Sequence, residues 1–116
     1  MQLIEFCKSK QITLVVVNMP VSEDMEKLAP GNAYKDFSKT LKSGSDAKQY
    51  LLIDLGQDKD FTDNLYIDGL HLNAVGAHMV AVKLAEHIKQ DYPEIVETIA
   101  RQAAQQKGAQ AGESHN

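Results

Sequence analysis

The chain has 116 residues, which is enough for one small domain and too few for two. Its 43% apolar and 24% charged residues are ordinary for a globular protein, which excludes wholesale disorder and a collagen-like fibre. A net charge of −4 without any basic block disfavours nucleic acid and anionic membrane surfaces as partners, and the single cysteine, Cys7, excludes an intramolecular disulfide.

The start of the chain shows one helical pattern and one strand pattern. Apolar residues at helical spacing predict a helix over residues 2–10, with Cys7 in the core. Residues 12–17 are rich in β-branched side chains and do not alternate, so they predict a strand buried on both faces, as in a parallel sheet covered by helices. Pro20 ends this strand because it has no N–H to donate, and residues 23–32 are expected to form a polar loop or a short helical turn.

A second helix and a second strand follow. The helix is predicted over residues 33–42, with Asn32 as its N-cap. Its apolar side chains recur at i, i+3 and i+7 and are expected in the core: Tyr34, Phe37 and Leu41. Another short apolar run predicts a strand over residues 50–55, and residues 57–72 are expected to form an irregular loop.

The C-terminal part is predicted to be helical and then disordered. Asn73 is expected to cap an amphipathic helix that runs to about Gln90. A weaker helix is expected over residues 93–104, and a disordered tail over 105–116, where there is almost nothing to bury. No run approaches the roughly 18 apolar residues of a membrane span, and the start lacks the basic region of a signal peptide, so we expect a soluble, unprocessed chain.

This order of elements indicates an α/β fold with a parallel sheet. A sheet of two strands is marginal by itself, and strands buried on both faces need neighbouring strands and two helical layers. We therefore expect one of two arrangements. Either the chain self-associates through an unpaired sheet edge, or it is the end piece of a larger domain.

Asp68 and His71 are the best candidates for catalytic residues. They lie in the loop after the second predicted strand, and ligands collect at the carboxyl ends of strands in parallel sheets. Their spacing lets a carboxylate hold one imidazole nitrogen and leaves the other for proton transfer, as in the Asp–His half of a Ser–His–Asp triad. Asp-x-x-His alone is weakly specific. Gly69 between them is expected to have a conformational role, because glycine permits an unusual backbone angle there.

The segment over residues 66–77, YIDGLHLNAVGA, resembles the last conserved block of the SGNH (GDSL-type) hydrolase superfamily. In that family, Asp-x-x-His precedes an amphipathic closing helix, and the elements over residues 1–90 are similar in order to the family's final third. The resemblance implies a three-layer α/β/α, flavodoxin-like domain, of which residues 1–92 are the C-terminal portion and hold the last two parallel strands and their helices. Leu72 and Asn73 after the histidine are similar to the DltD-like and alginate-acetylation branches.

The resemblance also implies an activity. Asp68 would orient His71, and His71 would be the general base that activates a serine and then protonates the leaving group. The family implies an ester hydrolase or O-acyltransferase that acts on esters or acylated carbohydrates and needs neither a cofactor nor a metal. A full-length parent of the DltD-like branch would be associated with the membrane or the cell envelope.

The nucleophile that the family requires is not visible in these residues. No Gly-Asp-Ser block is present, and no Gly or Asn block for the oxyanion precedes the segment. Ser45 lies in a Gly-Ser-Asp turn before a strand, whereas the nucleophile should follow the first strand of the sheet. Ser22 follows a strand, but an N-cap role is the stronger interpretation. The chain alone, as a fragment of the enzyme, is therefore expected to be inactive.

Two alternatives to a serine hydrolase or acyltransferase are a metal site and a non-catalytic role. His78 and His87 are nine residues apart and face different sides of the predicted helix, which disfavours zinc. The aspartates around the 57–72 loop lack the glycine and glutamate of an EF-hand, so they are expected to be solvated, with one of them at the rim of the cleft. The alternative to an enzyme fragment is a small non-catalytic α/β module that self-associates through its open sheet edge.

Overall fold

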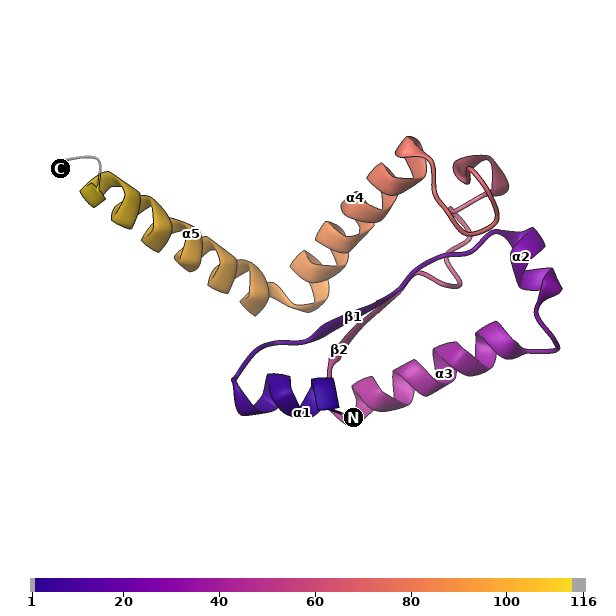
Figure 1. Ribbon diagram of the computed structural model, residues 1–116, viewed down its shortest axis with the longest axis horizontal. Coiled ribbons are helices and arrows are strands. Elements are labelled where there is room, and N and C mark those ends of the chain that lie inside the picture. Colours follow the sequence, from indigo (N-terminus) through magenta and orange to yellow (C-terminus); the bar gives the residue numbers. More distant parts are fainter. Residues whose placement is uncertain (1, 114–116) are drawn as a thin grey trace. The chain divides into compact units, whose positions relative to one another are not determined.

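The computed structural model describes the backbone of residues 2–113 and the side chains of residues 2–109 (Figure 1). The chain forms two compact units, Met1–His78 and Met79–Asn116, and the division falls within helix α4 (Ala74–Asp91). The described residues combine helices with a two-stranded parallel sheet. The chain is therefore of the α/β class, as its sequence predicts.

Helix α1 (Gln2–Ser9) forms where the apolar spacing predicts it. Ile4 and Cys7 lie one turn apart and are buried, with 9% and 6% of their surfaces exposed. The prediction that Cys7 is a core thiol is confirmed. The chain leaves the helix through Gln11, whose φ of +57° lies in the left-handed region, and enters strand β1 (Val15–Asn18).

Helix α2 (Glu23–Leu28) lies within the segment that was expected to be a loop or a short helical turn. Its N-cap is Ser22, whose Oγ accepts a hydrogen bond from the backbone N–H of Met25 at 3.2 Å. This bond confirms the capping interpretation of Ser22.

Helix α3 (Ala33–Asp46) differs from its prediction in three ways. It continues four residues beyond residue 42, its N-cap Asn32 makes no side-chain capping bond, and none of its residues is buried. Phe37 is 53% exposed, so the expected core stripe is wrong. The extension through Gly44 has a tertiary cause, because the Tyr50 ring packs against that glycine and its hydroxyl donates to the Leu41 carbonyl at 2.7 Å.

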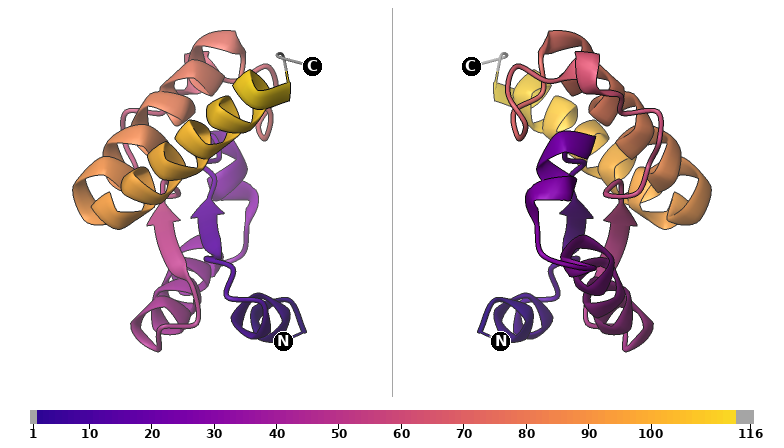
Figure 2. Two further views of the ribbon diagram at one scale, coloured as in Figure 1. Left: turned by 90° about the vertical axis from the view of Figure 1, so that its left-hand side faces the viewer. Right: turned by 90° about the vertical axis from the view of Figure 1, so that its right-hand side faces the viewer.

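Strands β1 and β2 (Leu51–Asp54) lie side by side and parallel, with Val15 opposite Leu51 and Asn18 opposite Asp54 (Figure 2). Both are shorter than predicted, and β1 begins at residue 15 instead of 12. Within the first unit, α3 packs against β2.

Burial differs between the two strands. In β2 Ile53 is almost completely buried, at 2% exposure, and so is Leu55 directly after the strand, at 0%, whereas the other three residues of β2 and every residue of β1 are half-buried. The prediction that both strands are buried on both faces is therefore wrong for β2 except at Ile53, and wrong throughout β1. Its backbone has one strand beside it in the described residues, so its side chains keep partial contact with solvent.

The loop after β2 contains a 3-10 turn, η1 (Asp63–Leu65), and leads into α4. The predicted cap is confirmed, because Asn73 Oδ1 accepts the backbone N–H of Gly76 at 2.9 Å. Helix α4 ends at Asp91, close to the predicted end.

Helix α5 (Pro93–Glu113) extends past residue 104, where its end was predicted. The prediction of a disordered tail is thereby corrected for residues 105–113, and residues 114–116 lie outside the described residues. Alanine and glutamine favour helix even without burial, and the described side chains from residue 96 onward are indeed exposed. No helix in the described residues is both long and apolar enough to cross a bilayer.

Candidate functional site

The loop between β2 and α4 brings Asp68 and His71 together in a tight turn. Tyr66 and Leu72 form an isolated antiparallel bridge, and the Ile67 N–H donates to the His71 carbonyl at 2.7 Å. These bonds close a short hairpin-like loop whose tip is the segment 68–71. The candidate residues are thus placed by backbone bonds within seven residues of sequence.

The side chains of Asp68 and His71 are in direct contact. His71 Nδ1 lies 2.8 Å from Asp68 Oδ2 and 2.9 Å from Oδ1. Asp68 Oδ1 also accepts the backbone N–H groups of Leu70 and His71, at 2.9 and 2.8 Å. The carboxylate therefore binds the imidazole and the backbone of the turn together, which restricts the orientation of the ring.

These hydrogen bonds hold the pKa of Asp68 well below its ordinary value of 3.8, at about 2. The largest cause is the backbone N–H of Leu70, followed by the His71 ring and the His71 N–H. Asp68 is consequently a carboxylate at neutral pH and can only accept hydrogen bonds. Nδ1 of His71 carries the proton in this contact, and in the neutral ring Nε2 is left as the proton acceptor.

The pair is open to solvent, with 59% of the Asp68 side chain and 74% of the His71 side chain exposed. Apolar side chains flank it, since Ile67 is 76% exposed and Leu70 is 53% exposed. An exposed, oriented imidazole is accessible to a substrate or to a nucleophile from another segment.

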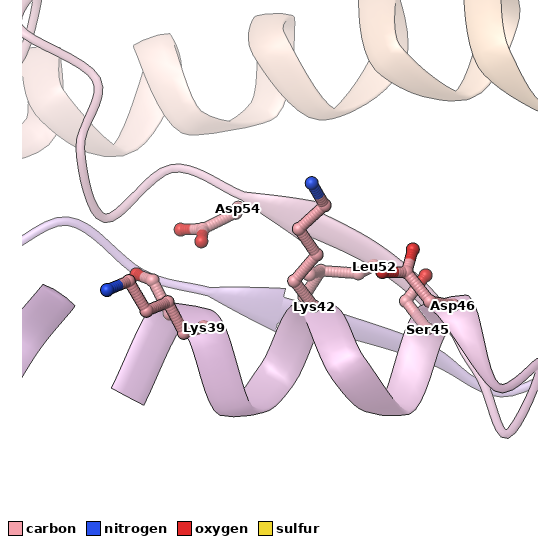
Figure 3. A pocket seen from close by; sticks show the side chains of 7 residues that line it. Lys39, Lys42, Ser45, Asp46, Leu52 and Asp54 are labelled. Carbon is pink, nitrogen blue, oxygen red and sulfur yellow. The ribbon is translucent and has the colours of Figure 1, made fainter. Parts of the chain in front are cut away.

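The two serines that the sequence analysis considered are not placed in the Asp68–His71 contact. Ser22 is 4% exposed and its Oγ caps α2. Ser45 lies in the last turns of α3 and lines a hollow of about 400 Å³ between this helix and β2. Figure 3 shows it there with Lys42 and Asp54, and the residues that line this hollow do not include Asp68 or His71.

A second hollow, of about 590 Å³, lies beyond the carboxyl ends of the two strands, where ligands collect in parallel sheets. Asp58 and Asp63 line it, in agreement with the expectation that a loop aspartate rims the cleft. Asp63 also joins the loop to α2, because its Oδ1 accepts the backbone N–H of Glu23 at 3.1 Å.

A polar cluster at the strand ends was not predicted from the sequence. Asp54 Oδ1 accepts the Asn18 side-chain amide and the Gly56 N–H, both at 2.9 Å, and the same amide lies 3.4 Å from Ser38 Oγ. Asn18 and Asp54 are the last residues of their strands and are paired in register. A polar residue at the end of each apolar run was the available signal, but the register was needed to pair them.

One other histidine in the described residues lies near a carboxylate. His87 Nδ1 lies 3.4 Å from Asp91 Oδ2 one turn along α4. Within the part of the chain that the structure describes, no group of three or more His, Cys, Asp or Glu side chains could hold a metal ion.

Comparison with protein-family models, with curated proteins and with solved structures found no match to this chain.

Proposed function

We propose that Asp68 and His71 are the orienting residue and the general base of an SGNH-like ester hydrolase or O-acyltransferase. The observation that supports this is the contact of His71 Nδ1 with both oxygens of Asp68, at 2.8 and 2.9 Å, with Nε2 on the other side of the ring. In this proposal β1 and β2 are the last two strands of a flavodoxin-like, three-layer domain, and the serine comes from outside the 116 residues.

The pair is suited to acyl transfer. His71 Nε2 takes the proton of the serine hydroxyl as the serine oxygen attacks the ester carbonyl, and the protonated ring then delivers that proton to the leaving alcohol. Water or an acceptor hydroxyl repeats the sequence on the acyl-enzyme. Asp68 holds the ring in the correct tautomer and stabilises the imidazolium. The substrates we propose are esters, including acylated carbohydrates.

The sheet edge supports the idea of further strands. Leu14 and Asn18 point their carbonyl groups toward β2, where they accept the N–H groups of Leu51 and Leu55 at 2.9 Å. Backbone groups alternate in direction along a strand, so Val15 and Val17 direct theirs to the opposite edge of β1. That edge can accept the strand of a larger domain.

The test starts with the coding sequence ahead of Met1 in the source. The proposal expects an in-frame Gly-Asp-Ser block within roughly 800 bases, a span sized for the rest of a typical domain. A promoter and a stop codon directly before Met1 would overturn it. With the longer product in hand, His71→Ala is expected to lower kcat on p-nitrophenyl acetate by about 10⁴-fold or more.

Two controls make this kinetic test specific. Asp68→Asn should also lower kcat strongly, because Nδ1 would lose its acceptor and the ring its tautomer. His87→Ala removes a histidine that also lies near an aspartate, 3.4 Å from Asp91, and should leave the rate unchanged. The 116-residue chain by itself should show the same background rate with and without His71→Ala. A burst that depends on His71 in this chain would contradict the missing nucleophile.

A second candidate is a non-catalytic module that dimerises through the outer edge of β1. The half-buried valines of β1 and its outward backbone groups favour it. Sedimentation of the chain over a range of concentrations tests this idea, with Val15→Pro as the variant. Proline is tolerated at the first residue of an edge strand, so Val15→Pro removes an outward N–H and should weaken a dimer that pairs there. A monomer at all concentrations would exclude this function.

A further inference from the structure

The turn between β1 and α2 contacts the middle of the Asp68–His71 segment. The backbone N–H of Ser22 donates to the carbonyl of Gly69 at 3.2 Å. Ser22 is the buried cap of α2, so its own position is restricted from both sides. A residue that lies 47 positions upstream therefore holds the peptide between Asp68 and His71.

That peptide has two bonds with opposite directions. The Gly69 carbonyl and the Leu70 N–H belong to the same planar trans peptide unit, so they point to opposite sides. The carbonyl accepts the Ser22 N–H at 3.2 Å, and the N–H donates to Asp68 Oδ1 at 2.9 Å. Any rotation of this plane that breaks the first bond also turns the Leu70 N–H away from Asp68.

Gly69 also packs closely against α2. An added Cβ on Gly69 would overlap the Met25 side chain, including its Cγ and Sδ, and would lie 3.3 Å from Ser22 Oγ. The only glycine with positive φ in the described residues is Gly31, so the expected unusual backbone angle at Gly69 is wrong. Glycine is needed at position 69 because the backbone there lies close to the Met25 side chain. This close contact packs the turn against α2.

We propose that Ser22 and Met25 are positioning residues for the base: through Gly69 they hold the 69–70 peptide so that Asp68 stays bound to the His71 ring. The catalytic meaning of this inference rests on the proposed function. The positioning of Asp68 by Ser22 and Met25 does not depend on the proposed function, because it concerns the hydrogen bonds of Asp68, which can be measured without substrate.

Carboxyl NMR titration of Asp68 in the 116-residue chain is the test, because the Leu70 N–H is the main reason why the Asp68 pKa lies near 2. Ser22→Pro removes the N–H that Gly69 accepts, and the φ of −64° at Ser22 already suits proline. Ser22→Ala is the matched control, because both variants lack the capping hydroxyl but alanine keeps the N–H. We expect the pKa of Asp68 to rise from about 2 toward 3.8 in Ser22→Pro and to stay near 2 in Ser22→Ala.

A second pair of variants guards against a proline that disturbs the fold. Gly69→Ala should raise the pKa of Asp68 in the same way, because the new methyl group meets Met25. Gly69→Ala combined with Met25→Ala should restore the low pKa, because the new methyl group then occupies the space that the Met25 side chain leaves and keeps the turn packed on α2. A backbone amide spectrum of each variant confirms that it is folded.

An unchanged low pKa in both Ser22→Pro and Gly69→Ala would overturn the positioning role. Failure of the double variant to restore the pKa would show that Gly69 acts through something other than Met25. Neither result bears on whether His71 is a base, which the kinetic test decides separately.

Discussion

Leu55 follows the last residue of β2 and has no exposed surface at all, so its replacement by alanine tests the packing of the first unit. Leu55→Ala removes three carbon atoms, worth about 0.8 kcal/mol each in transfer free energy, or about 2.4 kcal/mol together. The cavity left behind adds to this, and buried leucines replaced by alanine generally lose about 2–5 kcal/mol. We expect the free energy of unfolding to fall by about 3 kcal/mol.

Urea denaturation followed by circular dichroism measures this effect. With a slope of about 1–2 kcal/mol per molar urea for a small protein, the midpoint should fall by about 1.5–3 M. Leu28→Ala is the matched control, because the same atoms are removed from a side chain that is 77% exposed, and its free energy of unfolding should change by about 0.5 kcal/mol or less. If Leu55→Ala lowers the midpoint no more than Leu28→Ala does, Leu55 is not in a packed core and the reasoning is refuted.

Two further predictions concern acid stability and the extension of α3. Because the pKa of Asp68 is lowered in the folded chain from 3.8 to about 2, its ionised form favours folding above the ordinary value, and this contribution is lost as the pH falls through that range. Urea midpoints measured between pH 5 and pH 2 should therefore fall less steeply in Asp68→Asn than in the unchanged chain, and equal slopes would contradict the lowered pKa. Gly44→Ala places a methyl group against the Tyr50 ring and should reduce the free energy of unfolding by about 1–3 kcal/mol. Its control is Gly108→Ala, where the added methyl group meets nothing, so circular dichroism should show a higher helix content. If Gly44→Ala does not reduce the free energy of unfolding more than Gly108→Ala does, Tyr50 does not pack against Gly44.

Local sequence predicted three side-chain contacts correctly and one cap wrongly. The cap of α4 by Asn73, the cap of α2 by Ser22 and the contact of Asp68 with His71 all span three residues and were expected from residue type and spacing, whereas the expected cap by Asn32 does not form. Helix α1 and the ends of α4 likewise follow from apolar periodicity and capping. Such features depend on the conformation of one short segment, so a short stretch of residues encodes them.

Features that join distant segments could not be predicted in this way. Helix α3 passes through Gly44 because Tyr50 packs there, and Asn18 meets Asp54 only because the two strands pair in that register. Gly69 is required by Met25, which is 44 residues away, and not by its own backbone angle. The order of helices and strands and the Asp68–His71 pair follow from the sequence pattern. The contacts of the Asp68–His71 turn with Ser22 and Met25 depend on close packing between elements, which periodicity does not encode.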